Sequence, residues 1–588
     1  MRGIAWMSKH FIQIKDADRS KTEKEEICMK KKYGAALAAL LTLSVLLAGC
    51  GEKKSGDKAE TVSLGGDAKA ESTAEAAKPS GKQELIFVLS NQPDSLDPSY
   101  TNNSFATPFI INCFEGLVTY DTKGELVPGN AENWEKNEDM TVYTFHLRDG
   151  LKWSDGSPLT AEDYVYAAKH VCTPATTAQN LSMMTDYIEG AKEYYEGKGS
   201  DDSFGVKAID DKTLEYRLKA PCPFFVDIVS TWVYSPLQKA TIEANGDKWT
   251  QSANAYVCNG PFKISEINPG ASIVLTKNEN YWDAANVSLE KLNFRYILDT
   301  STALTAYENG EVDGIRSIPA GDIARLKAEN AGLVVAPSYG TVYYNIDCGK
   351  EPYNNPLVRK ALALAVDRNA LINNVVQLDA TPAYSVLPPG YVVDGKDITE
   401  GRSDFDLKPT ADPEAAKAAL AEAGYADPAS FPTIQLSYYS DDNAKKVAEA
   451  IAEMLTTNLG VKVEVSSADW AVFYDAVQNG NSEVAAMGCS ADYLNPMSFL
   501  PLLYTNDVAN ISFYSNPTYD AIVDQIRSER DPAKFAELVR KADETVSAEY
   551  PVLPLYYKSS TYLLHSYVSG VYMISNGNLY FKNAVVSK

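Results

Sequence analysis

The residues that could carry acid–base or metal chemistry are few and widely spaced. The chain has four histidines: His10, His146, His170 and His565. None lies in an H-E-x-x-H motif, and the sequence has neither a G-x-S-x-G turn nor a Walker-type phosphate loop. A carboxylate pair formed only in the fold stays open, because glycosidases have no compact motif. The sequence therefore gives no positive indication of an enzyme, and we expect no cofactor and no metal site.

Thiols are the second candidate chemistry. Six cysteines fall in the body of the chain and none forms a C-x-x-C pair, so a zinc site is not indicated. An extracellular location would permit disulfides, whereas free buried thiols fit the sequence equally well. The six are Cys113, Cys172, Cys222, Cys258, Cys348 and Cys489.

Cys50 stands apart from these six because of what precedes it. Three lysines come before an apolar stretch at 33–48, and Gly49 and Cys50 follow. This is the order of a secretory signal peptide, with positive residues, an apolar run and small residues at the cleavage site. Residues 47–50, Leu-Ala-Gly-Cys, resemble the lipobox of bacterial lipoproteins, where the thiol is lipidated and becomes the first mature residue. We expect Cys50 to be the lipidation site.

The alternative for this apolar stretch is a membrane-spanning or buried helix. A spanning helix needs about 20 apolar residues, and this stretch has 16, with Thr42 and Ser44 inside it. A core helix would be amphipathic, whereas this stretch is apolar on all sides. Residues 1–28 are mixed in charge and do not fit a signal peptide, whose basic region normally lies at the terminus. We expect translation to begin at Met29.

The chain is strongly acidic. It has 54 Lys and Arg against 78 Asp and Glu, a net charge of −24. Residues 1–49 contain nine of the basic and five of the acidic residues, so residues 50–588 have a net charge of −28. Such a chain is repelled by nucleic acid and by anionic membrane surfaces. Residues 50–588 are too many for one core and predict two or three lobes. The 36 tyrosines suit carbohydrate or peptide pockets, although well-packed strands account for most of them.

The elements that must position functional residues begin after a polar segment. Residues 51–82 have almost no large apolar side chains and predict a flexible tether. Apolar or alternating runs at 85–89 and 142–147 predict strands. Apolar stripes behind N-cap signals predict helices at 355–365 and about 442–457. Strands and helices alternate without a strict period, so the predicted fold class is α/β with mixed sheets in several lobes.

Several short segments between about 85 and 570 carry a resemblance when taken in order. They are S-L-D-P at 95–98, F-E-G-L-V at 114–118, F-H-L-R at 145–148, K-W-S-D-G at 152–156, L-T-A-E-D at 159–163, G-V-K-A-I-D-D at 205–211, K-W-T-Q at 248–251, N-G-P-F at 259–262, Y-W-D at 281–283, N-G-E-V-D at 309–313 and A-D-Y at 491–493. The set resembles the extracellular solute-binding proteins of family 5, which serve oligopeptide and dipeptide ABC transporters, and above all the oligopeptide-binding branch.

The resemblance implies a bilobal periplasmic-binding-protein-like fold with two hinge crossings and an extra domain in the first lobe. Ligand would lie in a cleft between lobes that close by hinge motion. The implied division is 1–49 as extension and signal peptide, 50–82 as lipidated cysteine and tether, 83–114, 259–340 and 559–588 as the first lobe, 115–258 as the extra domain, and 341–558 as the second lobe.

A general peptide binder must recognise what all peptides share, namely the backbone and two charged ends. Strand pairing recognises the backbone and leaves side chains to loose pockets. The resemblance places the pairing segments at Asn102, Asn103 and Ser104 in the first lobe and at Gly488, Cys489 and Ser490 in the second.

Three further positions match binding residues of the family. Asp492 matches an aspartate that takes the peptide α-ammonium; a charge-assisted pair is about twice as strong as a neutral hydrogen bond. Its alternative role is to cap the turn that follows it. Trp470 matches a tryptophan that lines a side-chain pocket, with packing on a helix face as the alternative. Tyr343 matches a cleft tyrosine near the hinge, but Tyr344 would point the other way in a strand, and the sequence does not decide between them.

The chain also departs from the oligopeptide-binding branch. Two family arginines that can meet the ligand's C-terminal carboxylate are Val477 and Ala486 here. The family tryptophan before the aspartate is Cys489, and a cysteine pair that bridges the lobe is Gly340 and Ser490. We do not expect that disulfide, and we leave open how the ligand carboxylate is bound and which peptide lengths are selected.

From these residues we expect the monomeric, lipid-anchored substrate-binding component of an ABC importer. It would capture short peptides at the extracellular face of the cell membrane, in a bacterium with a single membrane, and deliver them to a permease. ATP hydrolysis would take place in other subunits. Two alternatives stay open: a non-peptide ligand of the same family, such as a nickel chelate, a sugar or an opine, and a peptide-sensing receptor that does not import.

Overall fold

The computed structural model describes residues 79–588 except 102, 394–395 and 401–404. The predicted signal peptide, Cys50 and nearly all of the predicted tether therefore lie outside the described residues. Within the described ranges, no helix is both long enough and apolar enough to cross a membrane.

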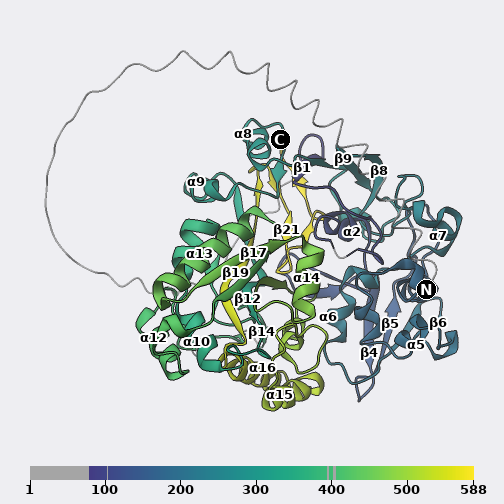
Figure 1. Ribbon diagram of the computed structural model, residues 1–588. Coiled ribbons are helices and arrows are strands. Elements are labelled where there is room, and N and C mark those ends of the chain that lie inside the picture. The colour runs from purple at the N-terminus through teal and green to yellow at the C-terminus, as the bar shows by residue number, and fades with distance from the viewer. Residues whose placement is uncertain (1–78, 102, 394–395, 401–404) are drawn as a thin grey trace, which may run out of the picture. The chain divides into compact units, whose positions relative to one another are not determined.

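A mixed sheet of eleven strands runs through the described residues (Figure 1). Its strands in spatial order are β17 (Val463–Ala468), β16 (Ile434–Tyr439), β18 (Val484–Ser490), β12 (Leu333–Ile346), β19 (Val552–Leu564), β11 (Gly314–Ile315), β1 (Glu84–Leu89), β10 (Lys291–Tyr296), β9 (Ser272–Lys277) and β8 (Phe262–Asn268), with β13 (Thr381–Pro382) paired to β19. The predicted strand at 85–89 is confirmed as β1, which pairs in parallel with β10 and β11.

The two longest strands, β12 and β19, join the two halves of this sheet. They pair antiparallel, and one end of the pair adjoins β11 while the other adjoins β18 and β13. Their register shifts between the Pro337/Ser559 pair and the Thr341/Tyr557 pair, so that three residues of β12 lie opposite Lys558. An irregularity of this kind twists and bends a strand locally, and here it lies between the two halves.

Helices cover the β17–β12 half of the sheet. Figure 1 shows α10 (Pro356–Leu364), α12 (Pro413–Glu422) and α13 (Asp442–Leu459) together beside β12 and β19. Both predicted helix starts are confirmed. Asn355 accepts a hydrogen bond from the Leu357 N–H ahead of a proline at the first helical position, and Asp441 accepts from the N–H groups of Asn443 and Ala444. Local capping chemistry therefore explains where these helices begin.

A separate four-stranded sheet lies within residues 131–217. Its order is β4 (Ala131–Lys136), β5 (Val142–Leu147), β7 (Thr213–Arg217) and β6 (Val206–Asp210), and helix α3 (Ala161–Val171) contacts it. The strand predicted at 142–147 is β5 as expected. Its alternate residues Tyr143 and Phe145 are buried against Tyr216, as a strand with one face on a core requires.

The remaining elements are short or lie at the margins of these sheets. They are α2 (Thr107–Cys113), β2 (Val118–Tyr120), β3 (Leu126–Pro128), α4 (Ser182–Thr185), α5 (Ala191–Tyr195), α6 (Phe225–Val229), α7 (Lys239–Asn245), α8 (Thr300–Glu308), α9 (Ile323–Ala328), α11 (Arg368–Ala370), β14 (Val392–Val393), β15 (Lys396–Asp397), α14 (Trp470–Gln478), α15 (Pro517–Ser528), α16 (Pro532–Ser547), β20 (Val568–Ser569), β21 (Tyr572–Met573), β22 (Leu579–Tyr580) and β23 (Val585–Val586).

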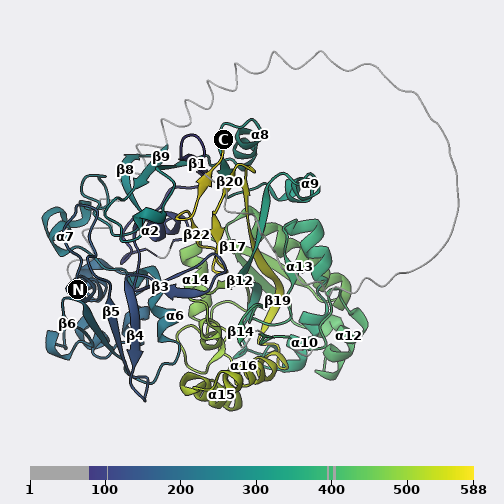
Figure 2. The same ribbon diagram turned by 180° about the vertical axis from the view of Figure 1, so that it is seen from behind.

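The first described residues lie beside the end of the chain. Ser80 forms an isolated parallel bridge with Ser587, and the Gln83 side chain donates to the Val586 carbonyl oxygen at 2.8 Å. Lys588 in turn pairs with Asp313 at 2.6 Å. Figure 2 shows the C-terminus near β1 and α8. The first described residues and the C-terminus therefore lie side by side.

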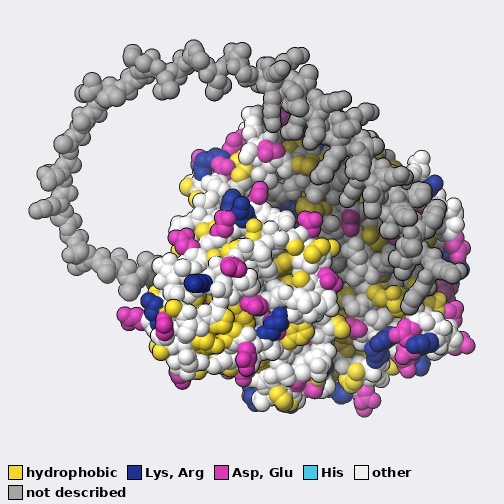
Figure 3. Space-filling model, in the orientation of Figure 1, with side chains coloured by type: hydrophobic (Ala, Val, Ile, Leu, Met, Phe, Trp, Pro, Cys, Tyr) yellow, Lys and Arg dark blue, Asp and Glu magenta, His cyan; other side chains and the backbone are white. Residues whose placement is uncertain are grey.

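The six body cysteines are free thiols, four of them buried and Cys348 and Cys489 half-buried. This decides between the two alternatives that the sequence left open. Gly340 and Ser490, which stand at the family's bridging cysteine positions, lie directly opposite each other on β12 and β18. The visible part of the surface in Figure 3 carries acidic side chains spread among basic ones, so the acidic balance is not gathered into one patch there.

Candidate functional site

A cavity of about 290 Å³ opens where strands β16 and β18 separate. The two strands pair only at Leu436/Val484 and Ser437/Ala485, after which β18 continues along β12 to Ser490. The edge of β18 that faces away from β12 therefore has no strand partner from Ala486 to Ser490 among the described residues. Such an edge presents free N–H and C=O groups to an extended chain.

The cavity collects residues that are far apart in the sequence. Tyr343, Trp470 and Gly488 were each singled out from the sequence, and all three line it. Cys489 and Ser490 continue β18 beyond Gly488. The remaining lining residues are Ala320, Val342, Tyr344, Val375, Val376, Leu378, Tyr439, Asp441, Asn443, Ala444, Val447, Ala486, Met487, Tyr556 and Lys558.

Trp470 is the first residue of α14 and presents its ring to this cavity. Its side chain is 53% exposed, its ring stacks on Tyr474 at 5.2 Å, and it meets Tyr439 edge to face at 5.4 Å. The buried side of α14 is formed instead by Phe473 and Val477. The Trp470 ring therefore packs against Phe473 and Tyr474 of its own helix, and its exposed part remains available to the cavity as an apolar platform.

Asp492 follows the last residue of β18 by two positions and carries an unpaired carboxylate. The side chain is exposed, yet the protein around it raises the pKa of its carboxyl to about 6 by desolvation. Its carboxylate accepts no hydrogen bond from the described residues, while the Asn495 side chain accepts from the Met497 N–H at 3.1 Å and Ser498 Oγ from the Asp492 N–H at 2.8 Å. The alternative role as a turn cap therefore falls to Asn495 and Ser498.

Tyr343 and Tyr344 lie on opposite faces of β12, as the period of a strand requires. Tyr343 is opposite Met487 and belongs to the larger core cluster, whereas Tyr344 is opposite Ala486 and packs with Tyr556. Both are buried, and both border the cavity. The buried Tyr344 hydroxyl has no hydrogen-bond partner among the described residues, so Tyr344 is a stronger polar candidate than the sequence indicated.

The expected pairing segment at 102–104 takes a different form. Asn102 lies outside the described residues. Asn103 and Ser104 lie outside any strand of the protein itself and lead through a turn into α2, so the pairing of this segment with a peptide stays a prediction. The Asn103 side chain accepts from the Phe105 N–H at 2.8 Å, and its carbonyl oxygen accepts from the Ala106 N–H at 3.0 Å. These local bonds fold the chain towards the helix.

Two cations near these segments were missed from the sequence. Arg316 donates to the carbonyl oxygens of Ser104 at 3.1 Å and Gly577 at 3.2 Å. Lys558 donates to Ser490 Oγ at 3.1 Å. A signal for Lys558 was present, because it is the one charged residue in the thirteen of β19. A charge carried into partly buried surroundings is costly unless it is paired or hydrogen-bonded.

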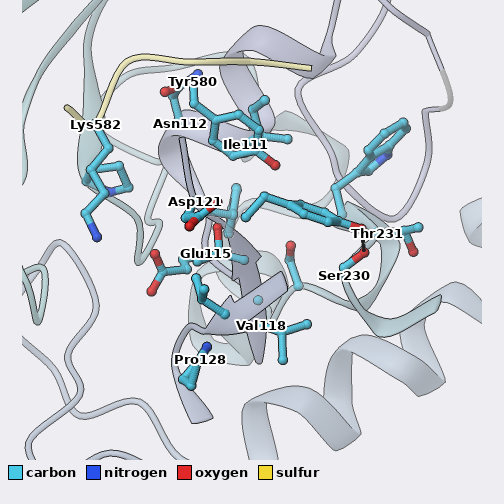
Figure 4. A pocket seen from close by; sticks show the side chains of 18 of the residues that line it. Ile111, Asn112, Glu115, Val118, Asp121, Pro128, Ser230, Thr231, Tyr580 and Lys582 are labelled. Carbon is cyan, nitrogen blue, oxygen red and sulfur yellow. Dashed lines mark hydrogen bonds between the residues drawn. The ribbon is translucent and has the colours of Figure 1, made fainter. Parts of the chain in front are cut away.

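A second cavity, of about 270 Å³, is shown in Figure 4 with Glu115 and Lys582 at its wall. Glu115 belongs to the F-E-G-L-V segment and is buried. Its carboxylate accepts from Tyr281 Oη and Trp282 Nε1, both at 2.5 Å. Burial raises its pKa, while Lys582, Trp282 and Tyr281 act against that. Because both of its carboxylate oxygens already accept hydrogen bonds from the protein, we assign Glu115 a structural role.

A mixed sheet whose halves are joined by two long strands, with an open strand edge above a cavity, is the architecture of a periplasmic binding protein. The family model described as "Bacterial extracellular solute-binding proteins, family 5 Middle" matches residues 125–510. The chain therefore belongs to the family 5 extracellular solute-binding proteins. Members of this family bind solutes and are not enzymes, in agreement with the sequence.

Individual relatives support this assignment over most of the chain. The oligopeptide-binding protein OppA of Bacillus subtilis is 34% identical over 566 residues, covering 95% of this chain and 99% of that protein. The periplasmic oligopeptide-binding protein OppA of Salmonella typhimurium is 35% identical, covering 86% and 93%. Haemophilus influenzae OppA, solved in complex with the peptide RPPGFSPFR, superposes with a TM-score of 0.72 at 30% identity, covering 87% and 100%. The predicted family and fold are thus confirmed.

Proposed function

We propose that this protein is the peptide-binding component of an ABC importer. The observation that carries the proposal is the open edge of β18, with Trp470 beside it and the unpaired carboxylate of Asp492 just beyond it. A peptide added along Gly488–Ser490 would gain backbone hydrogen bonds whatever its sequence. The relatives named as oligopeptide-binding proteins support the same ligand class.

In this proposal each residue has one task. Gly488, Cys489 and Ser490 pair with the peptide backbone, Asp492 takes its α-ammonium, and Trp470 contacts a ligand side chain. The turn at Asn103 and Ser104, held by Arg316, meets the peptide from the other side. Tyr343 and Tyr344 form the floor near the hinge.

We further propose that the chain divides into the lobes expected from the resemblance, with the hinge at 340–341 and 558–559. The register shift of β12 against β19 lies at these positions and supports that boundary. Contacts between the proposed second lobe and extra domain are polar or aromatic: Tyr493 stacks on Phe224 at 6.2 Å, and Asn495 donates to Asp227 at 3.1 Å. Such contacts can form on closure and break on opening.

Identification of a co-purified ligand tests the proposed function directly. Protein isolated under native conditions should release short peptides on denaturation, and mass spectrometry should detect them. Titration calorimetry of the stripped protein should then show saturable binding of such a peptide. Release of a sugar, an opine or a metal chelate in place of peptides would contradict the proposal.

Peptide affinity should fall as the pH drops through about 6. The raised pKa of the Asp492 carboxyl means that the free protein is ionised at this position at pH 7 and mostly protonated at pH 5. A protonated carboxyl cannot pair with an ammonium, so the apparent affinity should be about tenfold weaker at pH 5 than at pH 7. Calorimetry with a histidine-free peptide measures this, since its own termini scarcely titrate in that range. A pH profile that is equally steep in Asp492→Asn would assign the effect to another group.

We also propose that Cys50 carries a lipid that holds the protein at the extracellular face of the membrane, next to its permease. The order of basic, apolar and small residues before Cys50 supports this. Mass spectrometry of the mature amino terminus should find lipidated Cys50, and Cys50→Ser should leave an unprocessed precursor that begins at Met29. A precursor that begins at Met1 would contradict the proposed start.

A further inference from the structure

Lys558 extends from β19 across β12 towards the open edge of β18. Its Nζ lies 3.1 Å from Ser490 Oγ. A Cβ placed on Gly340 of β12 would lie 2.9 Å from Lys558 Cδ, and one placed on Gly488 of β18 would lie 3.7 Å from Nζ. The lysine therefore occupies the space that two glycines leave above neighbouring strands, and its ammonium lies beside the proposed peptide-binding edge.

The positive charge of Lys558 is not neutralised by the described part of the protein. No carboxylate of the described residues forms an ion pair with it, and it is the only Lys or Arg that lines the 290 Å³ cavity. The one acidic residue lining that cavity, Asp441, accepts the N–H groups of Asn443 at 2.9 Å and Ala444 at 2.8 Å. Lys558 is half-buried, and the partial burial lowers its pKa.

A second polar group in the same cavity, the Tyr344 hydroxyl, lacks any hydrogen-bond partner among the residues described. Tyr344 is 1% exposed and lines the cavity. Buried polar groups without partners are uncommon in folded proteins and need an explanation. An ammonium that has a hydroxyl partner but no counterion, and a tyrosine hydroxyl that has no partner among the described residues, indicate a ligand with hydrogen-bond acceptors and negative charge.

We propose that Lys558 is the anion anchor of this cleft, and that its ammonium pairs with a carboxylate of the bound peptide while Asp492 holds the α-ammonium. This inference rests on the proposed peptide-binding function and names its selectivity: ligands that carry a carboxylate in reach of the Gly488–Ser490 edge. The carboxylate is either the C-terminus or an acidic side chain. Gly340 is the positioning residue, because any side chain there would displace the lysine.

Matched peptides distinguish the two sources of carboxylate. The probes are Ala-Ala-Ala with a free or amidated C-terminus, and Ala-Glu-Ala-amide against Ala-Gln-Ala-amide. In one of the two pairs, wild-type protein should bind the peptide with the additional carboxylate more tightly. Lys558→Met should weaken the binding of that peptide by about 10- to 100-fold and leave the binding of the other peptide of the pair almost unchanged. If the variant loses the preference for the free over the amidated C-terminus, Lys558 binds the C-terminal carboxylate of the peptide. If it loses the preference for glutamate over glutamine, Lys558 binds an acidic side chain.

Two further variants control for indirect effects. Gly340→Ala should reproduce the loss of discrimination, since it moves the lysine without removing it, whereas Lys541→Met, on the exposed surface of α16, should bind all four probes as the wild type does. Circular dichroism checks that each variant is folded. If Lys558→Met binds peptides with every wild-type preference intact, the anchor is refuted and the proposed function stands. If wild-type protein binds none of the four peptides, both the proposed anchor and the proposed peptide-binding function are refuted.

Discussion

Asp492→Asn should weaken the binding of a short peptide by about 30- to 5,000-fold at pH 7.5, because truncating one partner of a desolvated charge pair costs about 2–5 kcal/mol. Most of that free energy is the penalty of leaving the ligand ammonium in the cleft without a counterion. Titration calorimetry with a free and an N-acetylated peptide measures it. The wild type should prefer the free peptide, and the variant should lose that preference.

Stability measurements separate this result from a folding defect. The Asp492 carboxylate accepts no hydrogen bond from the described residues, so asparagine removes no structural contact. Desolvation raises its pKa from 3.8 to about 6, so the folded state binds the proton more tightly than the unfolded state. Stability is therefore lost as the pH rises between these two values, and the full cost is present at pH 7.5. The unfolding temperature of the variant at pH 7.5 should therefore not fall. A clear drop in that temperature, or unchanged peptide affinity, would argue against Asp492 as the anchor.

Trp470→Ala is a useful companion to the Asp492 variant because the two residues serve different ligand groups. The exposed ring of Trp470 contacts the rings of Tyr439, Phe473 and Tyr474. Its removal should change the order of affinities across a panel of peptides that differ in one side chain. An unchanged order would contradict the proposed contact with a ligand side chain.

Glu115→Ala should lower the free energy of unfolding by about 3–5 kcal/mol, the range found when one partner of a buried charged network is removed. The substitution leaves the Tyr281 hydroxyl and the Trp282 indole N–H without acceptors in the scaffold. It also leaves Lys582 and Arg148 without the carboxylate they stabilise. Urea unfolding followed by tryptophan fluorescence or circular dichroism measures the change.

Glu115→Gln is the matched control for this substitution. Glutamine keeps one carbonyl acceptor of similar reach but turns an N–H₂ group towards the second donor, so it should cost less than alanine. Peptide binding by both variants, measured below their unfolding transitions, should resemble the wild type, because Glu115 does not line the cavity beside β18. A binding defect in folded Glu115→Gln would instead place Glu115 in the ligand site.

Local patterns in the sequence were sufficient for many elements of the fold. The apolar run at 85–89 became β1, the alternating run at 142–147 became β5, and the signals at Asn355 and Asp441 became the starts of α10 and α13. These features depend on side-chain periodicity and on caps within a few residues, so neighbouring residues determine them. The ordered motifs likewise determined the family and directed attention to Trp470, Asp492 and the end of β18.

Other features depended on contacts that no local pattern contains. The choice between Tyr343 and Tyr344 required knowing which core lies on each face of β12.

Lys558 shows most clearly what could not be predicted from the sequence. Its sequence signal was the one charge in a thirteen-residue strand, but its place beside Ser490 follows from the order β19-β12-β18, which brings together residues 558, 340 and 490. Thus the sequence alone determined the family, the local elements and the carboxylate that we propose for one end of the ligand. Only the tertiary structure revealed the opposite charge, because strand order and register arise from long-range pairing and not from local sequence.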